Sequence, residues 1–270
     1  MRLFRMAIGY FTLLGDSDWR KDHNMLLLGR NLWWIGPPIE LVVGGVAAII
    51  GMLLHSYTNS VGIAAAGMLV ALNGLRGFRI IDGFSDLAEA LFLSLTQPRI
   101  EKEALWDVVR SPQNGPYGTV LINLLVLFEW TCLAALLGHS VIGFAGFLVA
   151  ILISRFSSNL SVAAPNNIRA KSDFVLFAAE MSNRYRIFGM TLVTLALSFL
   201  AVYIAQGAIE IKSGVMVLGC FLIACISSWT AKLVIIWKLG EMNGDIIGFT
   251  QAVAEVSMLL WLNIVLTVGW

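Results

Sequence analysis

Apolar residues occur along this chain in long runs that are separated by short polar stretches. A helix needs about 20 apolar residues to cross a hydrocarbon core of roughly 30 Å. Runs near this length predict about seven membrane-spanning helices. The number of spans could also be six or eight, because the fourth run is short and the second is interrupted by glycines. The predicted spans are 37–55, 60–76, 117–137, 140–154, 188–206, 214–237 and 250–268.

Two shorter segments predict amphipathic helices at the membrane surface. The start, MRLFRMAIGYFTLL, is interpreted as uncleaved, because GDSDWRKDH follows it where a signal peptide would have a small-residue cleavage site. The segment PRIEKEALWDVVRS predicts a helix that starts near Pro98, with Ile100, Ala104, Leu105 and Val108 on its apolar face. The expected fold is an all-α polytopic membrane protein, with residues 1–270 as a single membrane-embedded domain.

The polar segments between the spans predict the orientation. With a cytoplasmic N-terminus and seven crossings, all 18 Lys and Arg residues except Lys212 fall on the inner side. This bias follows the positive-inside rule. The longer polar loops are then cytoplasmic, so we expect the active site at the cytoplasmic face of a protein of the inner membrane.

The composition is typical of a membrane protein and argues against a nucleic-acid partner. The chain is 58% hydrophobic and 13% charged, whereas soluble domains average about 25% charged residues. Its net charge of +1, without a dense basic run, predicts no nucleic-acid partner. The three cysteines and three histidines lack metal-type spacing. The expected partners are membrane lipid and, as an option, further copies of the same chain.

One polar group lies in GFRIIDGFSDLAEALF, residues 77–92. On a helix, Asp82, Asp86 and Glu89 fall within about 40° of one another. Such a stripe of like charge needs compensation. Ion pairs with Arg76 or Arg79 are one option. The other is Mg²⁺, which binds few carboxylates and completes its shell with water and phosphate oxygens.

A second polar group lies in KLGEMNGDIIGFTQAVAE, residues 238–255. Its glycines at 240, 244 and 248 favour either close helix packing or the approach of phosphate and metal to the backbone beside Asn243 and Asp245. Three carboxylates inside or at the ends of spans are further functional candidates, because an unpaired charge is costly there. They are Glu40, Glu129 and Glu255.

Two loops add candidates for binding an anionic substrate. VVRSPQNGPYGT, residues 108–119, is either a simple turn or a phosphate site that uses Arg110 and Asn114. AAPNNIRAKSD, residues 163–173, offers Arg169 but is also typical of an ordinary loop. Acids and arginines at one membrane face favour metal-assisted phosphoryl transfer.

The order of these motifs resembles the cobalamin synthase family, the adenosylcobinamide-GDP ribazoletransferases, whose signatures run GxHLDGLADTxDG, MRDSRxGxxG and GGxxGDxxGAxxExxE. The matching positions are Asp82, Gly83 and Asp86, then Arg110, Gly115 and Gly118, then Gly240, Asn243, Gly244, Asp245, Gly248 and Glu255. The departures are Glu89 for Asp, Ala90 for Gly, Ser111 for Asp and Gln113 for Arg, together with Glu241 and Phe249.

The resemblance implies a Mg²⁺-dependent transferase that joins adenosylcobinamide-GDP to α-ribazole or its 5′-phosphate and releases GMP. It implies metal ligands at Asp82, Asp86, Glu89 and Asp245. The catalytic residues would be Asp82, Asp86 and Asp245, with Asp86 or Asp245 as the base. The substrate-binding residues would be Arg110, Asn114, Arg169, Asn243 and Gly244. Two alternatives remain: a related phosphotransferase with another diphosphate-activated substrate, and a non-catalytic transporter or assembly subunit.

Overall fold

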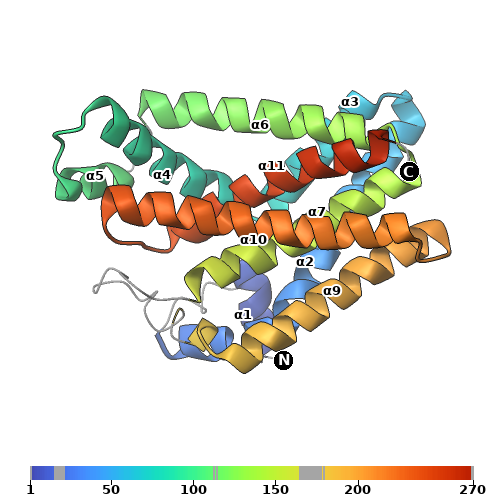
Figure 1. The fold of residues 1–270 in the computed structure, drawn as a ribbon, viewed down its shortest axis with the longest axis horizontal. Helices are drawn as coiled ribbons and strands as arrows, with labels where there is room; N and C mark the ends of the chain where they lie inside the picture. The colour runs from blue at the N-terminus through green and yellow to red at the C-terminus, as the bar shows by residue number, and fades with distance from the viewer. Residues whose placement is uncertain are drawn as a thin grey trace.

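The computed structural model describes residues 2–14, 22–111, 113, 115–163, 178 and 180–268. These residues form α-helices that pack side by side in an elongated bundle (Figure 1). The helices are α1 (Arg2–Phe11), α2 (Asp22–Thr58), α3 (Val61–Leu75), α4 (Arg79–Thr96), α5 (Lys102–Val109), α6 (Pro116–Leu137), α7 (Val141–Val162), α9 (Arg184–Gln206), α10 (Ile211–Leu239) and α11 (Asp245–Thr267).

Six of the described helices are long and apolar enough to cross a membrane, which confirms the predicted polytopic all-α class. They are α2, α6, α7, α9, α10 and α11. The short helix α3 covers the predicted second span. It passes the same test only together with α4, as a pair bent by 88°. Six or seven spans agree with the predicted range.

Two spans extend furthest beyond their predicted bounds. Helix α2 begins at Asp22 and continues through Pro37 and Pro38, because residues before the prolines already present a buried apolar face that includes Leu28 and Leu32. Helix α7 runs on to Val162 instead of ending near 154. The serines of its last turns donate to carbonyl oxygens three or four residues back, so their hydroxyl groups are satisfied inside the bundle.

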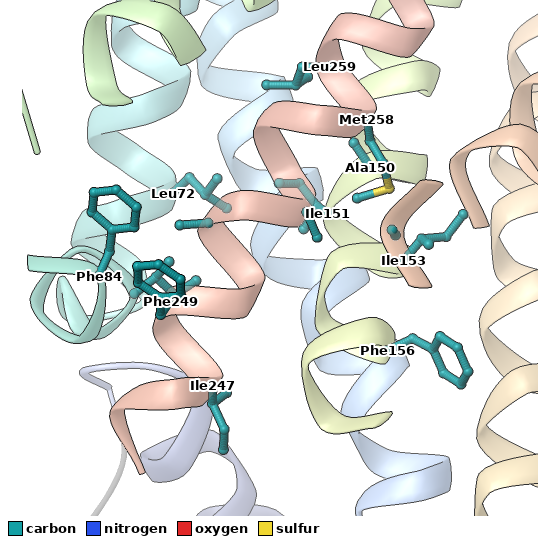
Figure 2. Close-up of a cluster of buried hydrophobic side chains, with 14 of the residues drawn as sticks. Leu72, Phe84, Ala150, Ile151, Ile153, Phe156, Ile247, Phe249, Met258 and Leu259 are labelled. Carbon is teal, nitrogen blue, oxygen red and sulfur yellow. The ribbon is translucent and has the colours of Figure 1, made fainter. Parts of the chain in front are cut away.

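The bundle is apolar both inside and outside. Buried apolar side chains form one continuous cluster that reaches from Ala7 to Leu266, with α7 at its centre (Figure 2). Large apolar side chains are also exposed on the outward faces of the spans, such as Leu127, Leu222 and Trp237. A soluble surface rarely carries so many exposed apolar groups, whereas a surface that faces lipid does. The chain is an integral membrane protein.

The predicted second surface helix is shorter than its sequence pattern. Helix α5 starts at Lys102, so Pro98 lies before it. Its buried face consists of Leu105, Trp106 and Val109, and Ala104 is exposed. The predicted apolar face is therefore only partly right, since Leu105 is buried and Val108 partly buried. The prediction did not include Trp106, whose indole N–H donates to the carbonyl oxygen of Leu239 at 3.3 Å. This contact packs α5 against the end of α10.

The segments that carry the candidate site meet at one end of the bundle, on the left in Figure 1. Helices α4 and α5 lie there together with the start of α6, the end of α10 and the start of α11. We call this part of the molecule the α5 end.

Candidate active site

Helix α4 begins at a sharp bend after α3. Gly77 has a φ of 68° and Phe78 a φ of 56°, both in the left-handed region. Glycine adopts such angles readily, but a residue with a bulky side chain seldom does. The bend places Asp82 in the first turn of α4, where it is exposed and where the helix dipole favours a negative charge. Asp86 follows one turn later and is partly buried.

Helix α11 begins with a local turn that orients Asp245. Helix α10 ends at Gly240, whose φ of 84° takes the chain out of the helical path. The side-chain oxygen of Asn243 accepts a hydrogen bond from the Asp245 backbone N–H at 3.2 Å, and its amide donates to the Asp245 carboxylate. Asn243, predicted to bind substrate, thus also positions Asp245. Gly244, predicted likewise, is the exposed N-cap residue of α11.

Two glycines allow the backbones of α4 and α11 to touch where the helices cross. A β-carbon at Gly83 would lie 2.8 Å from the carbonyl oxygen of Asp245. One at Gly248 would lie 2.9 Å from the carbonyl oxygen of Arg79 and 3.0 Å from that of Ile80. These distances leave no room for a side chain. Both glycines belong to the motifs, and their structural role is to permit this crossing.

The glycine repeat at 240, 244 and 248 therefore serves three different purposes. Gly248 packs against α4, as the packing alternative proposed, whereas Gly240 ends α10 and Gly244 precedes α11. The repeat is not one continuous packing stripe, because only its last member lies within a helix.

The crossing brings together three carboxylates from distant parts of the chain. Phe84 of α4 and Phe249 of α11 stack at the crossing, with their ring centroids 5.3 Å apart (Figure 2). Asp82, Asp86 and Asp245 each interact electrostatically with the other two. Like charges at such a place disfavour one another unless a cation lies among them. The crossing therefore holds three carboxylates that repel one another.

Basic side chains do not neutralise this charge within the described part of the chain, where Asp82 and Asp86 form no ion pair. The predicted alternative, in which Arg76 or Arg79 pairs with the acids of α4, is therefore wrong for these two aspartates. Arg76 binds Glu40 and Glu255 instead. Arg79 donates to the carbonyl oxygens of Gly9 and Tyr10, which caps the end of α1.

Magnesium binding by the three aspartates stays a prediction. Among the described residues, no group of three or more His, Cys, Asp or Glu side chains is arranged so that it could hold a metal ion as it stands. Magnesium does not require one, because it usually binds one or two carboxylates and takes its other ligands from water and phosphate. Asp82 is exposed and Asp86 and Asp245 are partly buried, so water can reach the group.

Glu89, the fourth predicted metal ligand, has a partner in another helix. It is buried, and its Oε2 accepts a hydrogen bond from the backbone N–H of Gly118 in the first turn of α6. A β-carbon at Gly115 would lie 2.2 Å from Glu89 Oε1. The carboxylate thus acts as an N-terminal cap for α6, where the helix dipole also favours negative charge. Metal binding by Glu89 stays a prediction.

The predicted substrate-binding arginine of the second motif lies at the surface. Arg110 follows α5, is about half exposed and has two weak ion pairs with Asp107 at 3.5 Å and Glu103 at 3.7 Å. Such exposed pairs contribute little, so the guanidinium can exchange them for an anion. Asn114 and Arg169 lie outside the described residues.

A second group of charged residues is buried between α2, α3, α7 and α11. Arg76 binds Glu40 and Glu255, each at 2.9 Å, and all three residues are at most 5% exposed. Ser154 and Gln251 donate to the same Glu255 oxygen at 2.8 and 3.1 Å. Two of the three carboxylates singled out in the spans therefore have a shared arginine partner.

Sequence reasoning missed most of this buried group. Arg155, assigned to a cytoplasmic loop, lies within α7, where it donates to Gln251 at 3.1 Å and stacks over the ring of Phe11. Lys232, also assigned to the inner side, is buried in α10. The first error arose because the predicted fourth span ended at residue 154, just before Arg155. Lys232 lies inside the predicted sixth span, 214–237, although its charge was counted on the inner side. Glu129 is buried in α6 and interacts electrostatically with Glu255.

Comparison with known proteins supports the motif assignment. The sequence model of the cobalamin-5-phosphate synthase family matches residues 3–263. A relative from Shewanella piezotolerans, named adenosylcobinamide-GDP ribazoletransferase, is 24% identical over 269 residues, which cover 98% of this chain and 96% of the relative. A relative of the same name from Mesorhizobium japonicum is 27% identical over 277 residues, which cover 97% of this chain and 93% of the relative.

A third relative of that name, from Clostridium perfringens, is 21% identical over 264 residues, which cover 98% of both chains. No solved structure matches the chain significantly. The resemblance predicted from the motifs is confirmed, since the family match includes all three of them. The chain belongs to the cobalamin-5-phosphate synthase family.

Proposed function

We propose that this protein is an adenosylcobinamide-GDP ribazoletransferase that acts in cobalamin biosynthesis and depends on Mg²⁺. The observation that carries the proposal is the crossing of α4 and α11, which collects Asp82, Asp86 and Asp245 at the α5 end. These residues come from two motifs separated by more than half the chain, so a role in packing alone would not require three acids there. Family membership and the names of the relatives supply the substrates.

Asp82, Asp86 and Asp245 would hold the metal ion through their carboxylate oxygens. Bound Mg²⁺ would neutralise the diphosphate of adenosylcobinamide-GDP and polarise its phosphorus for attack. Asn243 fixes the carboxylate of Asp245 by hydrogen bonding, which reduces the reorganisation needed when substrate binds. Glu89 would join the ligands only if its Oε1 turned from Gly115 towards the site.

The reaction transfers the cobinamide phosphate to α-ribazole or its 5′-phosphate. A ribazole hydroxyl oxygen bonds to the phosphorus that carries cobinamide, and the bond from that phosphorus to the bridging oxygen breaks. GMP leaves with the bridging oxygen, and the hydroxyl proton passes to a carboxylate, Asp86 or Asp245. Arg110 and Arg169 would neutralise charge that grows on the leaving phosphate, and Asn114 and Gly244 would contribute further polar contacts.

We also propose that the α5 end faces the cytoplasm in the inner membrane. The excess of Lys and Arg in the segments predicted to lie inside supports this orientation. Both substrates are highly polar and would then reach the site from the cytoplasm. Membrane lipid would cover the exposed apolar faces of the spans.

The test is a direct assay of the purified protein in lipid nanodiscs. The reaction contains adenosylcobinamide-GDP, Mg²⁺ and either α-ribazole or its 5′-phosphate, with GMP followed by chromatography and the corrinoid product by mass. We expect GMP and product in equal amounts. The Mesorhizobium japonicum relative in the same lipid is the matched control. No product from this chain, while the relative is active, would refute the proposal.

A further inference from the structure

Arg76 connects the bend before α4 to two other helices. It is the last residue before the left-handed pair Gly77 and Phe78, so its side chain leaves the backbone where the direction of the chain changes. We propose that Arg76 is a positioning residue that fixes this bend and thereby holds Asp82 and Asp86 of α4 against Asp245 of α11. The inference rests on the proposed function in treating these three aspartates as the active site.

The guanidinium of Arg76 holds two helices with separate nitrogen atoms. Its Nη1 donates to Glu255 Oε1 of α11 at 2.9 Å, and its Nη2 and Nε donate to Glu40 Oε2 of α2 at 2.9 and 3.3 Å. A planar, permanently charged fork suits this geometry, because it can address both carboxylates at once. The compact ammonium group of a lysine has no such fork.

The carboxylates that Arg76 binds are themselves fixed. Ser154 of α7 and Gln251 of α11 both donate to Glu255 Oε1. Glu40 Oε1 also lies 3.9 Å from Nε of Arg155, which in turn donates to Gln251. The bend is therefore tied to α2, α7 and α11, and not to a single flexible partner.

The position of this ion pair along α11 explains its effect on the site. Glu255 lies ten residues after Asp245, or about 15 Å along the same helix. Asp82 lies six residues after Arg76 on the other side of the bend. Arg76 thus attaches the bend before α4 to α11. Helix α4 itself contacts α11 where the two helices cross, at Gly83, Phe84 and Gly248. Arg76 fixes the point from which α4 starts, and the contacts at the crossing fix where α4 passes α11.

A cross-linking experiment tests the inference without depending on turnover. In a background with Cys132, Cys220 and Cys225 replaced by serine, the stacked pair Phe84 and Phe249 is changed to cysteines and joined by a short bifunctional thiol reagent. A second pair, Phe156 and Phe221, connects α7 with α10, with ring centroids 5.0 Å apart. That pair does not involve α4 and serves as the internal control.

Arg76→Gln is then introduced into both backgrounds. We expect cross-linking between positions 84 and 249 to become roughly tenfold slower, because a lost partner strongly weakens a buried ion-pair network. Cross-linking between positions 156 and 221 should not change. The matched control variant is Arg30→Gln, which removes an exposed arginine paired with Glu180 and should leave both rates unchanged.

Three outcomes are decisive. A slower cross-linking rate at positions 84 and 249 alone supports the inference. Arg76→Lys should then restore only part of that rate. Equal rates in Arg76→Gln and the parent overturn it. An equal loss at both pairs also overturns it, because Arg76 would then support the whole bundle and not the bend. Failure of the transferase assay would leave the cross-linking result intact, so the two proposals fail separately.

Discussion

Gly83 of α4 and Asp245 of α11 meet backbone to backbone, and a β-carbon at position 83 would lie 2.8 Å from the Asp245 carbonyl oxygen. This contact explains how two motifs far apart in the sequence produce one acidic group. The glycines are as important for the site as the aspartates, because the aspartates come close together only if the two helices touch.

The first prediction concerns this contact. Gly83→Ala should push α4 away from α11 and slow turnover roughly 10- to 100-fold, because displacement of catalytic groups by about 1 Å has effects of that size. Initial rates under saturating substrates check it. Gly45→Ala in α2 is the matched control, since a β-carbon there meets nothing within 4 Å. Equal activity in both variants would show that the close contact does not position the site.

The second prediction concerns the carboxylates of Asp82 and Asp245. Asp82→Asn and Asp245→Asn should each lower turnover by at least about 100-fold, because the carboxylates are proposed as metal ligands. Both variants should still express and keep their helical content, since the two side chains are not fully buried. Glu101→Gln removes an equally negative, exposed side chain at the same end of the bundle and should retain activity. Near-normal rates in both aspartate variants would exclude the metal site.

The third prediction separates two roles for Glu89. Glu89→Gln keeps an oxygen that can accept the Gly118 N–H, so it should remain folded and keep more than about a tenth of the activity. Glu89→Ala leaves that buried N–H without a partner and should lower the unfolding free energy by about 1–3 kcal/mol. Thermal unfolding in detergent and the transferase assay measure both effects. If Glu89→Gln loses as much activity as Asp82→Asn, Glu89 is a metal ligand as well as a cap.

Much of the fold could be predicted from the sequence because hydrophobic runs directly report helices in a membrane. All seven predicted spans correspond to helices of the structure, and the placement of Asp82 and Asp86 on one face of a helix followed from their spacing. The bend did not follow, because it depends on a phenylalanine at a positive φ. Local sequence favours glycine at such positions, so a phenylalanine at position 78 gave no signal of the bend.

The partners of the buried charges were also beyond sequence reasoning. Glu40 and Glu255 were recognised as unusual, but the partners considered for Arg76 were only the acids nearby in the sequence, whereas it binds Glu40 and Glu255. Helical spacing describes neighbours on one helix only. Which of several helices lies opposite a residue is decided by packing, and the same limit applies to Glu89, whose partner belongs to α6.

The last prediction uses the metal as a ligand of the folded state. If Mg²⁺ binds the native protein and not the unfolded chain, a concentration about 100 times its Kd should add about 2.7 kcal/mol to the unfolding free energy. Thermal unfolding with and without chelator measures this gain without any substrate. The gain should disappear in the double variant Asp82→Asn and Asp245→Asn and persist in Glu101→Gln. Calcium should stabilise less, because it requires more oxygen ligands than two or three half-exposed aspartates supply. A gain of the same size in the double variant would place the magnesium site elsewhere in the protein.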